Sequence, residues 1–173
     1  MVAYHDLEWG IPISGDVELF ERLALESFQA GLSWSTILRK REAFRVAFRG
    51  FDPAVVARFG ADDRARLLVD AGIVRNRAKI DATIGNAARF LEAVDEAGSF
   101  AVFLSTRVAQ PPVPRPRDAV MGDLPARTPA SDALSADLRR RGFGFVGSTI
   151  VYAFMQSTGL VDDHLPTCFR YRG

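Results

Sequence analysis

Glu26 is a carboxylate within a largely apolar stretch, residues 25–34. A glutamate among leucine and phenylalanine side chains is expected to be paired or functional, because an isolated buried charge is costly. Trp34 ends the same stretch, after a turn at Gly31. A carboxylate that accepts hydrogen bonds beside a large flat ring could grip a heteroaromatic base. The alternative is a surface glutamate with a tryptophan that fills the core, and this segment alone favours that alternative.

A glycine turn followed by cations marks a second candidate site. Gly72 precedes Arg75, Arg77 and Lys79. Backbone N–H groups at such a turn can face an anion at the start of a helix, where the helix dipole also favours negative charge. Three cations there could clamp the phosphates of a DNA backbone. Only one of the two glycines expected in such a motif is present, so a solvated pair of helices explains the segment equally well.

The ends of the chain carry the third group of chemically active side chains. His5 and His164 are the only histidines, and Cys168 is the only cysteine. The spacing of four residues between His164 and Cys168 suits two zinc ligands on one turn, and His5 could join them from the other end. Structural zinc prefers four ligands, so the spacing alone favours two ordinary histidines and a free buried cysteine.

Helices are the elements that must position these side chains. Asp16, Ser33 and Asp52 are candidate N-caps, and Asp62 or Asp63 is a candidate start for a further helix. The longest apolar stripe with helical spacing starts after Asn76. The expected helices are about 17–30, 33–50, a short one from 53, 62–70, a long one from 76, a short one from 99, 128–142 and 148–158.

The remaining chain shows no convincing strand and no internal repeat. Six of the nine prolines fall within 109–129, which excludes a continuous helix and predicts an irregular surface connection. The sequence therefore predicts an all-α protein with a single helical domain over 1–173. Its hairpin of two helices would span about 62–95.

Composition limits the class without identifying the activity. The chain has 173 residues, of which 48% are hydrophobic and 25% charged, so disorder and a disulfide scaffold are excluded. The single cysteine cannot form an internal disulfide, and no apolar run or signal-peptide pattern is present. A cytoplasmic protein with no membrane partner is expected. The net charge of +1 neither indicates nor excludes binding to nucleic acid.

Several stretches, in this order, resemble the DNA-3-methyladenine glycosylase I family, a branch of the helix-hairpin-helix DNA glycosylase superfamily. The matching stretches are Tyr4-His5-Asp6-x-Glu8-Trp9-Gly10, Leu25-Glu26-x-x-Gln29-Ala30-Gly31-Leu32-Ser33-Trp34, Ala71-Gly72-Ile73-Val74-Arg75-Asn76-Arg77, Ser131-Asp132-Ala133-Leu134-Ser135, Arg141-Gly142-Phe143-x-Phe145-Val146-Gly147 and Asp163-His164-Leu165-x-x-Cys168. Together they cover nearly the whole chain.

The resemblance implies a base-excision repair enzyme that hydrolyses the N-glycosidic bond of 3-methyladenine in alkylated double-stranded DNA. The enzyme would flip the base and act without a lysine nucleophile, as a monomer. Glu26 would be the catalytic residue and would accept hydrogen bonds from the base. Trp34 would stack on the base, with Tyr4 and Trp9 completing an aromatic pocket. The alternative from another class is a non-catalytic DNA-binding or damage-sensing module.

The resemblance also implies the DNA and metal contacts. The turn containing Gln29, Gly31 and Leu32 would press into the duplex where the base has left. The hairpin residues Gly72, Arg75, Arg77 and Lys79 would hold phosphates. The residues His5, His164 and Cys168 match three ligands of a structural zinc site that joins the two chain ends.

The sequence departs from the family pattern near its first residues. The usual cysteine of a Cys-x-Trp segment is absent, so zinc would have three protein ligands plus water, be weakly held or be missing, or the true start lies upstream. A second departure replaces an aromatic Trp-Ser-Phe segment with residues 105–107. A third places Gly144 where a lysine is typical, which removes one possible phosphate contact.

Overall fold

The computed structural model describes residues 2–109 and 111–172, and within them it contains helices and irregular segments but no strand. The all-α prediction is therefore confirmed. The helices are α1 (Val2–Leu7), α2 (Asp16–Gln29), α3 (Trp34–Ala47), α4 (Pro53–Val56), α5 (Ala61–Val69), α6 (Arg77–Ala97), α7 (Phe100–Ser105), α8 (Pro129–Arg140) and α9 (Ser148–Ser157), with 3₁₀ turns η1 (Arg49–Phe51) and η2 (Met121–Asp123). No helix in these ranges is long and apolar enough to cross a membrane.

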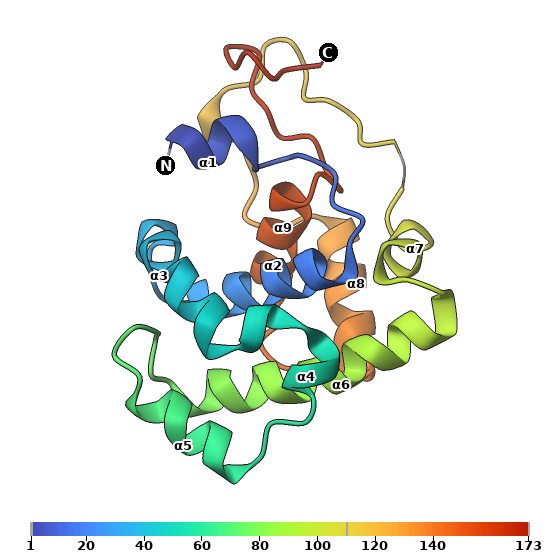
Figure 1. Cartoon of the computed structure of the whole chain (residues 1–173). Helices are drawn as coiled ribbons and strands as arrows, with labels where there is room; N and C mark the ends of the chain where they lie inside the picture. The colour runs from blue at the N-terminus through green and yellow to red at the C-terminus, as the bar shows by residue number, and fades with distance from the viewer. Residues whose placement is uncertain (1, 110, 173) are drawn as a thin grey trace.

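The central elements are α2 and α9, which pack against each other, and α9 also packs against α8 (Figure 1). Both helices are buried around most of their circumference, as central helices are, although α2 also carries charged side chains. Phenylalanine rings fill the space between α2, α3 and α6, and Phe28, Phe44 and Phe90 are fully buried. Edge and tilted ring contacts, such as the 4.7 Å centroid separation of Phe28 and Phe44, add to the burial of apolar area.

Most of the predicted N-terminal capping residues are confirmed, and those of α2 and α5 are wrong. Ser33 and Asn76 accept hydrogen bonds from backbone N–H groups in the first turns of α3 and α6. Asp16 is not the N-cap of α2, because Gly15 has that position and the Asp16 carboxylate instead accepts from the Phe100 N–H at the start of α7, at 2.9 Å. The cap of α5 is Gly60 rather than an aspartate.

The N-terminal helix α1 was not among the predicted elements. It has six residues, too few for a periodic pattern, and side-chain contacts hold it in place. The Glu8 carboxylate accepts two hydrogen bonds from Arg41 of α3, at 2.5 and 3.0 Å. Arg170 Nη1 donates to the Asp6 carbonyl at 2.8 Å, so α1 is also tied to the last segment of the chain.

Over its described residues 111–128, the proline-rich connection is irregular apart from η2, as predicted, and it runs beside the C-terminal segment (Figure 1). Arg115 anchors it to the interior, because its Nε donates to the buried Asp163 carboxylate at 2.6 Å. Tyr171 donates to the Arg115 carbonyl at 2.6 Å from the other side. The connection is therefore attached to the rest of the protein at Arg115.

Candidate active site

Four helices surround a pocket of about 310 Å³. It is lined by Tyr4, His5, Trp9, Glu26, Gln29, Trp34, Ala153 and Gln156. The structure thus brings together all four residues expected to contact the base, although they come from α1, α2, the start of α3 and the segment after α1. A cavity with aromatic walls and a few polar groups is the usual form of a site for a small aromatic ligand.

Glu26 is the buried carboxylate of this pocket, with 4% of its surface exposed. Burial raises its pKa to about 7, because the charged form loses its hydration, and the Ser157 hydroxyl and the Arg22 charge offset part of this rise. The carboxylate therefore ionises near neutral pH. An acceptor that becomes negative in an apolar pocket is suited to a cationic ring.

The raised pKa predicts that Glu26→Gln stabilises the folded protein at high pH. The unfolded carboxyl loses its proton near pH 4.5 and the folded one near pH 7, so stability falls as the pH rises between these values. Above pH 7 the ionised group costs about 3 kcal/mol. Urea unfolding at pH 5 and pH 8 should show a gain for Glu26→Gln that is small at pH 5 and much larger at pH 8. Glu18→Gln, at an exposed position of the same helix, is the control, and an equal gain at both pH values would contradict the prediction.

Arg22 was not predicted from the sequence, yet it orients the pocket wall. Its guanidinium donates to the Tyr4 hydroxyl and lies 3.6 Å from the Glu8 carboxylate. The Tyr4 ring lies 5.3 Å from the Trp34 ring, centroid to centroid. Arg22 stands four residues before Glu26, so both project from the same face of α2. That spacing of an arginine and a glutamate in an apolar helix was the available signal.

Gln156 was also missed, and a buried network fixes its amide. Its Nε2 donates to Asp163 at 2.7 Å, and Asp163 also accepts from Tyr152 and Arg115. A carboxylate held by several donors only accepts, so the amide nitrogen must face Asp163 and the amide oxygen must point away from it. The side chain of Gln156 also lines the pocket.

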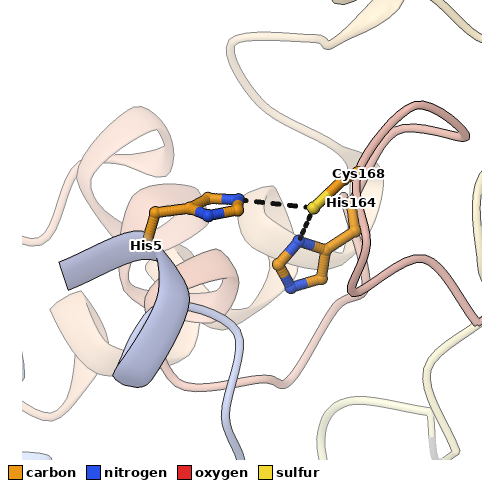
Figure 2. Close-up of side chains that lie close together, drawn as sticks. All are labelled: His5, His164 and Cys168. Atoms are coloured by element: carbon orange, nitrogen blue, oxygen red, sulfur yellow. Dashed lines mark hydrogen bonds between the residues drawn. The ribbon is translucent and has the colours of Figure 1, made fainter. Parts of the chain in front are cut away.

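The predicted metal ligands converge, as Figure 2 shows. Cys168 Sγ lies 3.5 Å from His5 Nε2 and 3.5 Å from His164 Nδ1, and the three ligand atoms lie within 4.8 Å of one another. Tetrahedral zinc with its usual bond lengths separates nitrogen and sulfur ligands by about 3.6 Å. The Asp6 carboxylate accepts from His5 Nδ1 at 2.9 Å, which leaves Nε2 free to bind a metal. These residues fit a metal ion, and they were the full set of ligands predicted.

The cluster and the pocket share a wall. Trp9 lies edge-on to His164, with ring centroids 4.8 Å apart, and lies parallel to His5 at 5.9 Å. A metal bound by the two histidines would therefore hold Trp9 in place.

The turn after α2 exposes the side chain of Leu32 to solvent, as expected of a segment that contacts the duplex. Gly31 has a φ of 78°, a left-handed conformation that favours glycine, and Leu32 follows with 43% of its surface exposed. The Leu32 N–H donates to the Gln29 carbonyl at 2.6 Å and closes the turn.

Lys79 differs from its expected role as a phosphate ligand. Its side chain is buried, and Nζ donates to the carbonyls of Phe28 and Ala30, at 2.9 and 2.5 Å. These are carbonyls at the end of α2, which lack partners within the helix. The ammonium therefore supports the turn after α2, and its burial disfavours the expected contact with phosphate.

Gly72 also differs from its expected role as a phosphate ligand. The hairpin of α5 and α6 is present, but the structure indicates another reason for a glycine at this position. Its N–H donates to the Asp70 carboxylate at 2.7 Å and is not open to an anion. A Cβ at this position would lie 2.9 Å from the Ala43 Cβ, so the glycine allows the hairpin to approach α3. Arg75 and Arg77 are exposed at the start of α6 and remain candidates for phosphate contact.

Comparisons with known proteins agree with this geometry. The family model described as methyladenine glycosylase matches residues 1–171. The DNA-3-methyladenine glycosylase 1 of Escherichia coli K12 is 48% identical to this chain, and the match covers 99% of this chain and 91% of the relative. The DNA-3-methyladenine glycosylase of Haemophilus influenzae is 44% identical, and the match covers 96% of this chain and 90% of the relative. A crystal structure of 3-methyladenine DNA glycosylase I superposes with a TM-score of 0.93 at 47% identity, over 99% of this chain and 93% of the other. The Staphylococcus aureus enzyme, studied for its recognition of 3-methyladenine, superposes equally well at 38% identity, over 99% and 91%. The chain belongs to the methyladenine glycosylase family.

Proposed function

We propose that the Glu26 pocket carries out the reaction of this family, the hydrolytic release of 3-methyladenine from alkylated DNA. The observation that carries the proposal is a buried carboxylate among the rings of Tyr4, Trp9 and Trp34, in a cavity suited to one flipped base. Methylated DNA incubated with the protein should yield free 3-methyladenine, detected by chromatography of the released bases. A non-catalytic module would bind this DNA and release none.

The chemistry needs few groups. Methylation at N3 gives the adenine a positive charge, so the glycosidic bond is already weak. Its electron pair leaves with the base, which departs neutral, while water adds to the sugar carbon and loses a proton to solvent. Ionised Glu26 holds the cation, and Trp34 stacks on its face. An undamaged base lacks the charge and gains less from the carboxylate, which gives selectivity.

The positions of the lysines support a monofunctional glycosylase, which releases the base without using a lysine as nucleophile and without cleaving the DNA strand. The chain has two, Lys40 and Lys79, and neither lines the pocket. Both donate to backbone carbonyls, Lys40 to those of Ala71 and Gly72. A covalent intermediate on a lysine is therefore not part of the proposal.

We assign duplex contacts to the turn containing Gln29, Gly31 and Leu32 and to the exposed cations Arg75 and Arg77. The exposed Leu32 would enter the space left by the flipped base. The two arginines lie at the N-terminal end of α6, where the helix dipole also favours phosphate. A monomeric state and a cytoplasmic location stay predictions.

Removing both cations by Arg75→Ala with Arg77→Ala should weaken duplex binding without changing the pocket. The logarithm of the binding constant decreases with the logarithm of the salt concentration, and each phosphate contact contributes about 1 to the steepness of this line. The line should therefore be shallower by about 2 in the double variant. Fluorescence anisotropy across a salt series measures it. The control is Arg89→Ala, which removes a cation pairing with Glu92 further along α6. An unchanged slope in the double variant would exclude these phosphate contacts.

We infer that the metal is zinc, held by His5, His164 and Cys168 with water completing the shell. Zinc accepts this mixture of nitrogen and sulfur ligands. It would supply no step of the reaction. The three residues would join α1 to the C-terminal segment and thereby keep Tyr4 and Trp9 in the pocket wall.

A further inference from the structure

Three buried polar side chains hold the loop between α8 and α9, residues 142–147. Asn86 of α6 both donates to and accepts from the backbone of Gly144, at 2.9 and 2.7 Å. Ser27 of α2 donates to the Phe145 carbonyl at 3.0 Å. Ser135 of α8 donates to the Val146 carbonyl at 2.6 Å. Three different helices thus fix one short loop, and the glycosylase reaction as proposed above assigns it no role.

The loop displays one aromatic ring. Phe143 and Val146 are buried and anchor the loop in the core, whereas Phe145 between them is 37% exposed. Its φ is 54°, in the left-handed region that a bulky residue rarely adopts. Phe51 has a similar φ of 57°, but its ring is fully buried, so packing compensates for the strain there. The Phe145 ring is only partly buried, so packing compensates for less of the backbone strain at this residue.

The ring lies next to the segments assigned to the duplex. Lys79 Nζ is 6.0 Å from the centroid of the Phe145 ring. The same ammonium donates to Phe28 and Ala30, directly before the turn that carries Leu32. Lys79 also belongs to the first turns of α6, two residues after Arg77. Phe145 is therefore close to both the apolar turn and the start of the hairpin helix.

We propose that Phe145 is a second apolar contact to the duplex, stacking on a base or sugar beside the position from which the damaged base has flipped. The proposal rests on the function proposed above, because it requires a flipped base. Flipping leaves neighbouring bases with an uncovered face, and apolar or aromatic side chains cover such faces in proteins that distort DNA. A ring already fixed by its loop loses little conformational freedom on binding.

The test is Phe145→Gly, because glycine removes the ring and also relieves the strained backbone. Affinity is measured by anisotropy with a duplex that carries a stable tetrahydrofuran abasic analogue. We expect it to fall about 10-fold, the scale of one stacking contact. The protein should stay folded, with a melting temperature that falls only modestly, because glycine adopts a φ of 54° without a steric penalty and this offsets part of the burial lost with a ring that is 37% exposed. Phe145→Tyr should restore the affinity, and Phe145→Leu should restore part of it.

Two further measurements separate duplex contact from a structural role. Binding of free 3-methyladenine, followed by tryptophan fluorescence, should be unchanged in Phe145→Gly, because the ring lies outside the pocket. Val102→Ala, which trims an exposed apolar side chain on α7, should leave duplex affinity unchanged. An unaltered duplex affinity in Phe145→Gly would overturn the proposal. So would a large fall in melting temperature together with loss of free-base binding, since the ring would then be structural.

Failure of the proposed function is detected separately. If the wild-type protein releases no 3-methyladenine from methylated DNA, the reaction assignment fails. The abasic duplex contains no base to release, so the difference in its affinity between Phe145→Gly and the wild-type protein tests the Phe145 contact independently of the reaction.

Discussion

Glu26→Gln is expected to slow the release of 3-methyladenine from methylated DNA about 100-fold at pH 8, the usual effect of losing one preorganised electrostatic contact. The amide keeps the shape of the carboxylate and can still accept a hydrogen bond, but it carries no charge to hold the cationic base. The loss should appear mainly in kcat/KM. Affinity for the abasic duplex should be nearly unchanged, because Glu26 is buried in the pocket and does not face the phosphates.

The pH profile identifies the active form of this carboxyl. With a pKa of about 7 in the free protein, roughly a tenth of Glu26 is ionised at pH 6 and nine tenths at pH 8. The wild-type kcat/KM should therefore rise through pH 7 and level off, and Glu26→Gln should remove this rise. Glu18→Gln should keep both the rate and the profile. Unchanged release by Glu26→Gln would remove Glu26 from the site.

Cys168→Ser is expected to lower the stability of the protein and to abolish its zinc content. A ligand present at 1,000 times its dissociation constant stabilises the folded state by about 4 kcal/mol, and this contribution is lost with the metal. A chelator should lower the melting temperature of the wild-type protein and should have little effect on Cys168→Ser. Base release should fall in both cases, because α1 and its pocket residues lose the metal that ties them to the C-terminal segment and keep fewer contacts, such as the one between Arg170 and the Asp6 carbonyl.

The matched control for the metal is Thr167→Ser, an exposed position next to the ligand. Metal analysis of the purified wild-type protein gives the stoichiometry directly. Protein that contains no zinc as isolated, takes up none when it is supplied, and melts at the same temperature with and without chelator would refute the zinc assignment.

Much of the pocket could be predicted, but only through the resemblance of several ordered motifs to one family, because the segment with Glu26 and Trp34 alone favours a surface glutamate and a core tryptophan. Glu26 is a charge in an apolar helix, and Trp34 follows a glycine turn, so both stand out in the sequence. The ligands His5, His164 and Cys168 stand out because the chain has so few residues of these types. The spacing of these residues in the sequence could not show that they converge, because His5 and Cys168 lie near opposite ends of the chain.

The missed features depend on contacts between distant segments. Lys79 belongs to a cluster of cations in the sequence, yet the packing of α6 against the end of α2 places its ammonium on carbonyls about 50 residues away. Gly72 is part of a recognisable turn, but its neighbour across the contact, Ala43, is set by tertiary packing. Asp163, which fixes the Gln156 amide, also accepts from Arg115 of the proline-rich connection, about 50 residues earlier in the chain. Local patterns carry no information about such pairs.

The contact between His5 and Cys168 joins residues 163 positions apart. During synthesis, α1 is made before the C-terminal segment that contacts it. The wall formed by Tyr4 and Trp9 therefore gains this support only after residues 164–170 have been made. A nascent or truncated chain that lacks this segment could present its hairpin cations to DNA but would have a less firmly held pocket wall, so we expect it to bind DNA better than it removes bases.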